Sequence, residues 1–169
     1  GKPLASTVTI WPSIAPSWTE WCRALITQTK IVMPPPVHAR SATIFSDASS
    51  TGWGVVLFYR GQVFSRGGQW TIAQKALHIN VLELLAAIIA QRFCVATLNI
   101  SPLEPAIIEH FIDNTTALCH IRNKRAHGFV ANEVLRQAMS EAHGYFATYQ
   151  YVDTLHNVAD SNSRLPAPT

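Results

Sequence analysis

The order of strand-like and helix-like stretches from Ser41 onward constrains the fold more than any other feature of this chain. Strands are expected at 42–46, 53–59, 62–65, 106–112 and 145–152, and helices at 78–93, 130–143 and 157–164. Gly52 and Gly54 mark a turn before the second strand. Arg60-Gly61 suits a tight turn after it, so the first three strands should form an antiparallel meander. Strands that come both before and after helices along the sequence predict an α/β fold with a five-stranded mixed sheet flanked by helices.

An N-terminal part of different character precedes this pattern. The run Pro34-Pro35-Pro36 separates the two, because consecutive prolines hold an extended connector. We therefore expect an N-terminal extension over 1–40 and a globular domain over 41–169. Ser17-Trp18-Thr19-Glu20 fits a capping box, and the apolar spacing after it predicts an amphipathic helix over about 17–30. The tryptophan-bearing face of that helix needs a partner, either the following domain or a neighbouring domain of a larger polypeptide.

Composition narrows the function classes only slightly. A chain of 169 residues with 48% hydrophobic residues can bury one sizeable core. The net charge of +3 is a weak hint of a polyanionic partner. Three cysteines without a C-x-x-C pair argue against a disulfide scaffold or a zinc knuckle and suit a reducing compartment. No membrane partner or secretory signal is expected, because the longest strongly apolar stretch, 81–90, is short and contains Glu83.

Basic residues gather in one stretch of the chain. Between Asp113 and Glu133 there is no acid, and the interval carries Arg122, Lys124 and Arg125. This stretch is either a solvated loop or a patch that contacts phosphates.

Four of the ten acidic residues stand where they could share one surface: Asp47, Glu83, Asp113 and Asp160. Asp47 and Asp113 each end a predicted strand, which is where an open α/β sheet presents its functional crevice. Glu83 lies on the second turn of the predicted helix among apolar neighbours. Each acid also has a structural alternative: a strand-end Asp often forms a turn, Asn80 with Glu83 could be a capping box, and Asp160 could lie on an exposed helix face.

Clustered carboxylates favour the binding of divalent cations. They raise one another's pKa, and a protein normally tolerates such a group in order to hold metal ions. Oxygen ligands without paired His or Cys point to Mg²⁺ or Mn²⁺ rather than zinc. Two such ions can activate a water and stabilise the leaving oxygen of a phosphodiester. The reaction that this pattern indicates is phosphodiester hydrolysis.

Four motifs, taken together, resemble a known family. They are DASSTGWG at 47–54, HINVLELLAA at 78–87, DN at 113–114 and NVADSNSR at 157–164. They look like the motifs of ribonuclease H (RNase H) domains attached to reverse transcriptases, and the resemblance runs from about 41 to 165. Their style is closest to tyrosine-recombinase (DIRS-like) retroelements, including trypanosomatid members such as VIPER, and hepadnaviral polymerases are also similar.

The resemblance implies roles for particular residues. It makes Asp47, Glu83, Asp113 and Asp160 catalytic ligands of two Mg²⁺ ions, for which Mn²⁺ can substitute. It places Asn80 at the minor groove of an RNA·DNA hybrid. Thr115 and Thr116 would bind a backbone phosphate, or else serve as helix caps. His156 is the local candidate for a catalytic histidine that many members carry before the last acid, and its alternative is a surface residue capping the last helix.

The resemblance implies an RNase H-like fold and an endonuclease that cuts the RNA strand of RNA·DNA hybrids during reverse transcription, leaving 5′-phosphates. Residues 1–40 look like the end of a reverse-transcriptase connection region, so the partner would be a polymerase of the same polyprotein, in a cytoplasmic retroelement particle or in the nucleus. The long basic handle of cellular members is absent, which predicts weak binding by an isolated domain. The alternatives are a related integrase or resolvase, whose acids usually run Asp, Asp, Glu, and a non-catalytic connector, which usually lacks one acid.

Overall fold

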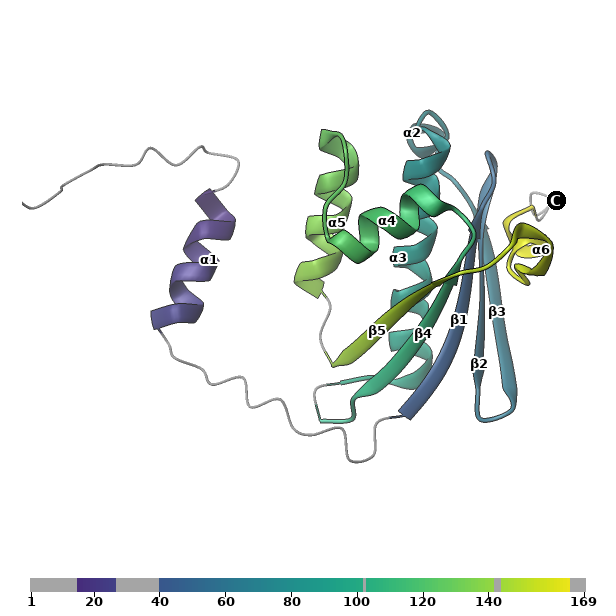
Figure 1. Cartoon of the computed structure of the whole chain (residues 1–169), viewed down its shortest axis with the longest axis horizontal. Coiled ribbons are helices and arrows are strands. Elements are labelled where there is room, and N and C mark those ends of the chain that lie inside the picture. Colours follow the sequence, from purple (N-terminus) through teal and green to yellow (C-terminus); the bar gives the residue numbers. More distant parts are fainter. Residues whose placement is uncertain (1–14, 27–39, 102, 142–143, 165–169) are drawn as a thin grey trace, which may run out of the picture. The chain divides into compact units, whose positions relative to one another are not determined.

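The computed structural model describes residues 15–26, 40–101, 103–141 and 144–164 (Figure 1). The chain divides into two compact units, residues 1–37 and residues 38–169. The predicted boundary at 40/41 lies close to this division. Roles for the extension and for its junction with the domain remain predictions.

The N-terminal unit contains one described helix, α1 (Ala15–Ile26). It begins two residues earlier than predicted, so Ser17 lies inside the helix and cannot be its cap. Pro16 stands in the first turn, where its missing N–H costs nothing, and the Thr19 hydroxyl donates to the Ala15 carbonyl at 2.8 Å. The predicted end at residue 30 lies outside the described residues. Trp18 is exposed within this unit.

A five-stranded mixed sheet forms the second unit, as predicted. Its strands are β1 (Arg40–Ala48), β2 (Gly52–Tyr59), β3 (Gln62–Gln69), β4 (Ala106–Ile112) and β5 (Tyr145–Tyr151), in the order β3-β2-β1-β4-β5. The three strands on the β3 side pair antiparallel, whereas β1 with β4 and β4 with β5 pair parallel. The predicted turn at Arg60-Gly61 is confirmed: both residues have positive φ, 50° and 77°, as a two-residue hairpin of this kind requires.

Helices cover both faces of the sheet. They are α2 (Ile72–Lys75), α3 (Ile79–Leu98), α4 (Thr115–Asn123), α5 (Phe129–Glu141) and α6 (Asp160–Ser163), with a short 3₁₀ turn η1 (Thr154–His156). The long helix α3 packs on β1 and β2 with α4 and α5 beside it, and α6 lies against the other face (Figure 1). The last helix, predicted over 157–164, is shorter than expected, because residues 157–159 form a loop and turn after η1 and the helix begins only at Asp160.

The central helix α3 is five residues longer at its C-terminus than predicted, and it ends where Asn99 adopts the left-handed conformation with φ 48°. By length and composition it could cross a membrane, but more than half of it is buried inside this domain. Its apolar side meets Ile44, Leu57 and Ile108 of the sheet. This core fixes the position of α3 relative to β1 and β4.

A buried polar network interrupts that core beside the strand end. The ring of His110 on β4 contacts Ser46 Oγ through Nε2 at 2.9 Å and Gln91 of α3 through Nδ1 at 3.4 Å. Gln91 also accepts from the Tyr145 hydroxyl and donates to that of Tyr149. Burial lowers the pKa of His110 to about 3, so the ring is neutral in the native state near neutral pH.

Two glycines of β2 have a role that differs from the predicted turn. Neither Gly52 nor Gly54 has positive φ. A Cβ on Gly54 would lie 2.4 Å from the Ala159 carbonyl oxygen and 2.6 Å from the Ser163 nitrogen, both backbone atoms at α6. Gly52 is equally restricted by the Gly68 carbonyl at 2.4 Å. The glycines are needed because the backbones of α6 and of β3 approach β2 closely.

Gly54→Ala should therefore push α6 away from β2. We expect a loss of about 1–3 kcal/mol in the free energy of unfolding, the usual cost of overpacking, measured by urea denaturation. Ser65→Ala, at an exposed position of the neighbouring strand β3, should stay within about 0.5 kcal/mol of wild type. Equal stabilities of the two variants would show that α6 adapts freely.

Candidate metal centre

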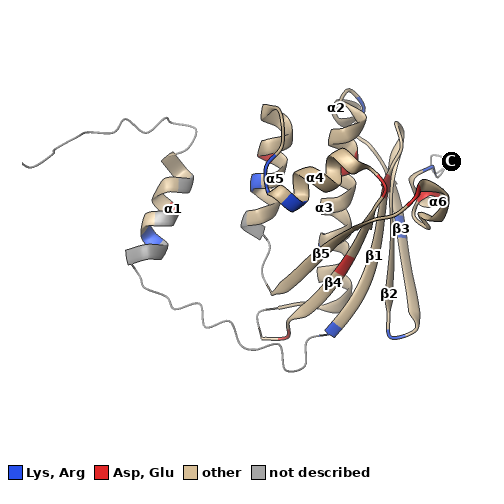
Figure 2. Cartoon of the chain, in the orientation of Figure 1, with Lys and Arg blue, Asp and Glu red and all other residues tan. Residues whose placement is uncertain are grey.

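The parallel register of β1 and β4 brings two acids to the same edge of the sheet. Ser46 is the partner of Ile112, so the next residues, Asp47 and Asp113, lie side by side. Asp47 is the second-last residue of β1, and Asp113 directly follows β4. Figure 2 shows acidic residues at these strand ends and on α6. The predicted placement of two carboxylates at corresponding strand ends agrees with the observed backbone.

Glu83 completes a cluster of three carboxylates. It lies on the second turn of α3, whose N-cap is His78 and not Asn80, so the capping-box alternative for Asn80 and Glu83 is wrong. One carboxylate oxygen from each of Asp47, Glu83 and Asp113 lies within 4.8 Å of the other two. Asp47 is 3% exposed and Glu83 is 6% exposed.

Two oxygens in this cluster are buried without any hydrogen-bond partner: Asp47 Oδ2 and Glu83 Oε2. Burial of an unpartnered carboxylate oxygen is costly. Hard oxygen donors that converge in this way fit a divalent cation such as Mg²⁺. The residues present are therefore suited to the metal that the sequence predicted.

The electrostatics of the cluster agree with its geometry. Burial, followed by the negative charges of Asp47 and Asp113, raises the pKa of Glu83 to about 9. Burial also raises the pKa of Asp47, with further contributions from Asp113 and Asp160. In the absence of a cation, protons therefore offset part of the repulsion, and a divalent cation would compete with them for the same oxygens.

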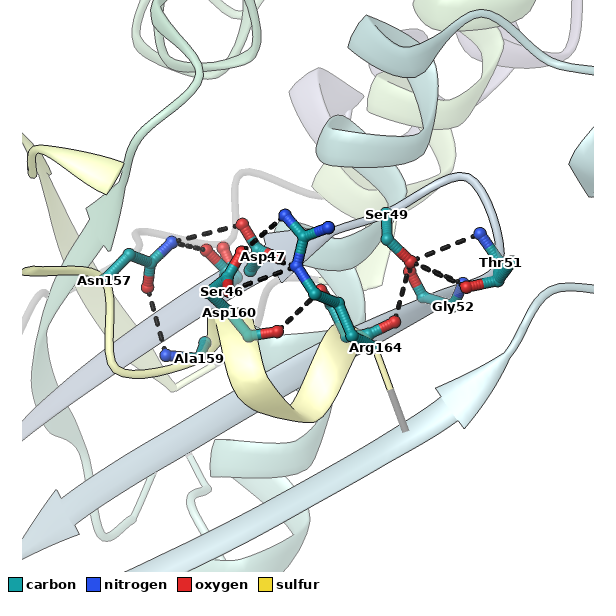
Figure 3. Close-up of polar contacts among 10 residues, drawn as sticks. Ser46, Asp47, Ser49, Thr51, Gly52, Asn157, Ala159, Asp160 and Arg164 are labelled. Atoms are coloured by element: carbon teal, nitrogen blue, oxygen red, sulfur yellow. Dashed lines mark hydrogen bonds and ion pairs between the residues drawn. The ribbon is translucent and has the colours of Figure 1, made fainter. Parts of the chain in front are cut away.

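Asp160 lies outside the cluster of three. It begins α6, and its carboxylate accepts hydrogen bonds from Arg164 one helical turn later, at 2.8 Å from Nη2 and 3.0 Å from Nε (Figure 3). The negative charge of Asp160 still contributes to raising the pKa of Asp47 and of Glu83, and its role as a fourth ligand remains a prediction. Asp160 is not one of the three clustered carboxylates.

Asn157 links the last segment of the chain to the strand that carries Asp47. Its side-chain amide donates to the Ser46 carbonyl at 3.0 Å and to Asp47 Oδ1 at 3.4 Å. Its Oδ1 accepts from the Ala159 amide at 3.2 Å, which orders the backbone before Asp160. Asn157 is buried, and its contacts orient Asp47 relative to α6 (Figure 3).

A second link joins α6 to the turn after β1. Ser49 Oγ donates to the Ser163 carbonyl at 2.7 Å and accepts from the Gly52 amide at 3.0 Å. Trp70 Nε1 donates to the Ser49 carbonyl at 2.9 Å. Together with the close approach at Gly54, these bonds hold α6 against the acidic edge of the sheet.

The predicted nucleic-acid contacts near the acids lie at the starts of α3 and α4. Asn80 Oδ1 accepts from Asn114 Nδ2 at 3.2 Å, which joins the two helix starts beside Asp113. Asn114 is the N-cap of α4, and its side chain accepts from the Ala117 amide, so the alternative that Thr115 or Thr116 caps the helix is wrong. Thr115 is exposed and Thr116 is half-buried as the first residues of α4.

The basic stretch begins in the last turn of α4 and continues past its end. Arg122 donates to the Tyr149 carbonyl of β5 and is therefore engaged with the sheet edge. Lys124 is the left-handed C-cap of α4, and both it and Arg125 have exposed side chains. Figure 2 shows this basic region beside α4 and α5.

His156 lies in η1 with a side chain that is 76% exposed. Its Nδ1 lies 3.5 Å from Asp153 Oδ2, and none of its described contacts involves the four acids. The last helix, α6, has Ala159 as its N-cap without a side-chain bond, so the alternative that His156 caps this helix is wrong. A catalytic role for His156 remains a prediction.

Three residues that contribute to the site belong to the sequence motifs but were not predicted as site residues: Asn157, Ser49 and Arg164. Only Arg164 has a sequence signal, because Asp160 and Arg164 stand four residues apart, the spacing of an ion pair on one helix face. The contacts of Asn157 and Ser49 join segments more than a hundred residues apart. Such long-range pairing is not visible in the motifs.

Comparisons with known proteins agree on the fold. No family model and no curated protein matches the chain. The chain is similar to solved structures of RNase H domains. RNase H1 from the archaeon Halobacterium salinarum matches with a TM-score of 0.56 at 15% identity, covering 73% of this chain and 93% of that one. The N-terminal RNase H domain of rv2228c from Mycobacterium tuberculosis matches with a TM-score of 0.53 at 14% identity, covering 73% and 91%.

A third similar structure is LC11-RNase H1, solved in complex with an RNA/DNA hybrid. Its TM-score is 0.52 at 15% identity, and the match covers 72% of this chain and 91% of that one. At these identities the likeness concerns the fold, and it confirms the predicted RNase H-like architecture of five mixed strands with flanking helices.

The raised pKa of Glu83 predicts how stability depends on pH. The native state holds this proton more tightly than the unfolded chain, so the stabilising contribution is complete below the ordinary pKa of 4.5 and is lost as pH rises toward about 9. In chelator, wild type should therefore lose stability relative to Glu83→Gln between about pH 5 and about pH 8. Urea unfolding of both proteins across this range measures the difference.

His110 also makes stability depend on pH, but it does not affect the difference between the two proteins. Its lowered pKa acts in the opposite sense, because stability is present above the ordinary value of 6.5 and is lost as pH falls toward about 3. This contribution is the same in both proteins and cancels in their difference. Parallel stability curves for wild type and Glu83→Gln would contradict the buried, proton-binding state of Glu83.

Proposed function

We propose that the domain over 41–169 is a metal-dependent ribonuclease H that hydrolyses the RNA strand of RNA·DNA hybrids. The observation that carries this proposal is the convergence of Asp47, Glu83 and Asp113, with two buried carboxylate oxygens that have no partner. A fold of the RNase H type supports it, because the three acids stand on two strand ends and on the central helix of that fold.

The chemistry follows from the donor set. Asp47, Glu83 and Asp113 would hold one divalent cation, and Asp47 with Asp160 would frame a second. Bound cations of this kind lower the pKa of water and stabilise the charge that develops on a phosphodiester. Asn157 keeps the Asp47 carboxylate oriented through its amide, and attack by water leaves a 5′-phosphate and a 3′-hydroxyl.

The substrate would lie across the starts of α3 and α4. Asn80 is proposed to reach the minor groove, where 2′-hydroxyls distinguish RNA from DNA. Thr115 and Thr116 would bind a phosphate through hydroxyl and backbone donors at the start of α4. Lys124 and Arg125 are exposed and available for further phosphate contacts. Arg122 would act mainly by holding α4 to β5.

A retroelement is the proposed biological setting of this domain. The motif style supports a retroelement of the DIRS-like group, in which the domain acts beside the reverse transcriptase of the same polyprotein. Residues 1–40 would connect the two. This arrangement would compensate for the missing basic handle, because a polymerase that already holds the hybrid raises its local concentration.

Cleavage of a labelled RNA·DNA hybrid tests the proposal. We expect RNA-strand cuts in Mg²⁺ or Mn²⁺ with 5′-phosphate ends, and no cleavage in chelator. Asp47→Asn and Asp113→Asn should reduce the rate by at least about 100-fold, because each removes a carboxylate placed for the cation. Both variants should retain at least wild-type stability without metal, because one repelling charge is gone. Glu109→Gln, at an exposed acid of β4, is the matched control and should cleave at the wild-type rate.

The outcomes separate the alternatives. Hybrid binding without cleavage under any metal would favour the non-catalytic connector. Cleavage or strand joining on DNA duplexes would favour an integrase- or resolvase-like enzyme. Products with 2′,3′-cyclic ends would exclude attack by water.

Salt dependence tests the basic stretch. Replacing Lys124 and Arg125 with alanine should weaken hybrid binding for every sequence and reduce the slope of log K against log salt by roughly 1 for each phosphate that is no longer neutralised. Arg60→Ala, at the hairpin tip at the other end of the strands from Asp47, should leave the slope unchanged. An unaltered slope in the double variant would assign the stretch to a solvated loop.

A further inference from the structure

Arg164 engages both oxygens of Asp160, the acid that stands apart from the cluster. Its Nε lies 3.0 Å from Oδ1 and 3.1 Å from Oδ2, and its Nη2 lies 2.8 Å from Oδ1 (Figure 3). A planar guanidinium matches a carboxylate in this two-pronged way better than any other cation among the side chains. The guanidinium therefore engages both of the oxygens through which Asp160 could bind a metal ion.

The influence of Arg164 extends to the buried cluster. The hydrogen bond with Asp160 and the charges of Asp160 and Asp47 raise the pKa of the guanidinium. In return, the Arg164 charge lowers the pKa of Asp47, against the larger effect of burial. The same side chain thus interacts with two of the four acids.

The position of Arg164 relative to Asp47 is set by the fold. Its helix α6 is fixed to the turn after β1 by the bond from Ser49 to the Ser163 carbonyl and by the close contact at Gly54. Asn157 bonds both to Asp47 and to the backbone before Asp160. An ordinary surface ion pair has no such fixed relation to a buried acid.

We propose that Arg164 is an internal counter-cation of the acidic centre, which competes with the second divalent cation for Asp160 and must release this carboxylate when that cation binds. The inference rests on the proposed function and concerns the metal affinity of the same site. Among the three clustered acids, only Asp47 is reached by the charge of Arg164, whereas both oxygens of Asp160 are bonded to it. Arg164 should therefore act mainly on the second position.

Displacement of Arg164 from Asp160 by a divalent cation should cost little free energy. The Arg164 side chain is 65% exposed and that of Asp160 is 34% exposed, and ion pairs with this much access to water contribute little to stability. A divalent cation brings twice the charge of the guanidinium and can displace it. Without a cation, Arg164 neutralises Asp160 and limits the repulsion among the four acids.

Titration of the metal-free chain with Mn²⁺, in the absence of nucleic acid, tests the proposal by calorimetry. In Arg164→Gln, the weaker of two binding events should strengthen by roughly 3- to 10-fold, the effect of removing one screened charge near a divalent ion. The tighter event, assigned to the clustered acids, should change less. Arg164→Lys keeps the positive charge but loses the planar guanidinium, and its affinity for Mn²⁺ at the weaker event should stay within about 2-fold of wild type.

Two controls isolate the mechanism. Arg136→Gln breaks a comparable exposed ion pair with Glu133 on α5 and should leave both events unchanged. In an Asp160→Asn background, adding Arg164→Gln should have a much smaller effect on the weaker event, because only the charge of Arg164 near Asp47 is then removed. An undiminished Arg164 effect in this background would overturn competition for Asp160.

The remaining outcomes separate this inference from the proposed function. Two binding events that are unchanged in Arg164→Gln would overturn the counter-cation while leaving the metal centre intact. Weaker binding in Arg164→Gln would also overturn it, because Arg164 would then position Asp160 for the metal. Absence of binding in wild type and in both Arg164 variants would overturn the inference together with the metal-dependent function.

Discussion

The parallel pairing of β1 with β4 is the constraint on which the rest of this structure depends. Its register sets Asp47 beside Asp113, and the core between α3 and these strands brings Glu83 to the same point. Like charges in a buried place oppose folding. The hydrophobic packing of α3 must therefore outweigh the repulsion that it creates, which is a common property of sites built to receive a cation.

The support for this site comes from both faces of the sheet. On the α3 side, the neutral His110 bridges Ser46 and Gln91 directly beneath the strand end. On the other side, α6 approaches β2 so closely that only glycine fits at Gly54. Each support satisfies backbone or side-chain polar groups that would otherwise be buried without partners. A shift of either face would move the carboxylates relative to one another.

The four acids occupy two environments, and this division suits the proposed chemistry. Asp47 and Glu83 have low exposure and raised pKa values, and Glu83, whose pKa is about 9, must release its proton when it binds a cation. Asp160 is more exposed and is already neutralised by Arg164. The proposed hydrolase would accordingly have two cation positions of unequal affinity, and it could fill the weaker one together with its polyanionic substrate.

The sequence by itself determined the order of the five strands and the places of α3 and α5 among them, the tight turn at Arg60-Gly61 and the positions of Asp47 and Asp113 at strand ends, because alternation, turn chemistry and chain order are local properties. It did not determine the extent of α3, although Asn99 at its end is a residue type that often adopts the left-handed conformation after a helix. Only the tertiary structure decided that Glu83 joins the two aspartates, that Gly54 is needed for close packing, and that Asp160 lies outside the cluster. These features depend on contacts between distant segments, and their energies arise from burial and register, which no local pattern in the sequence encodes.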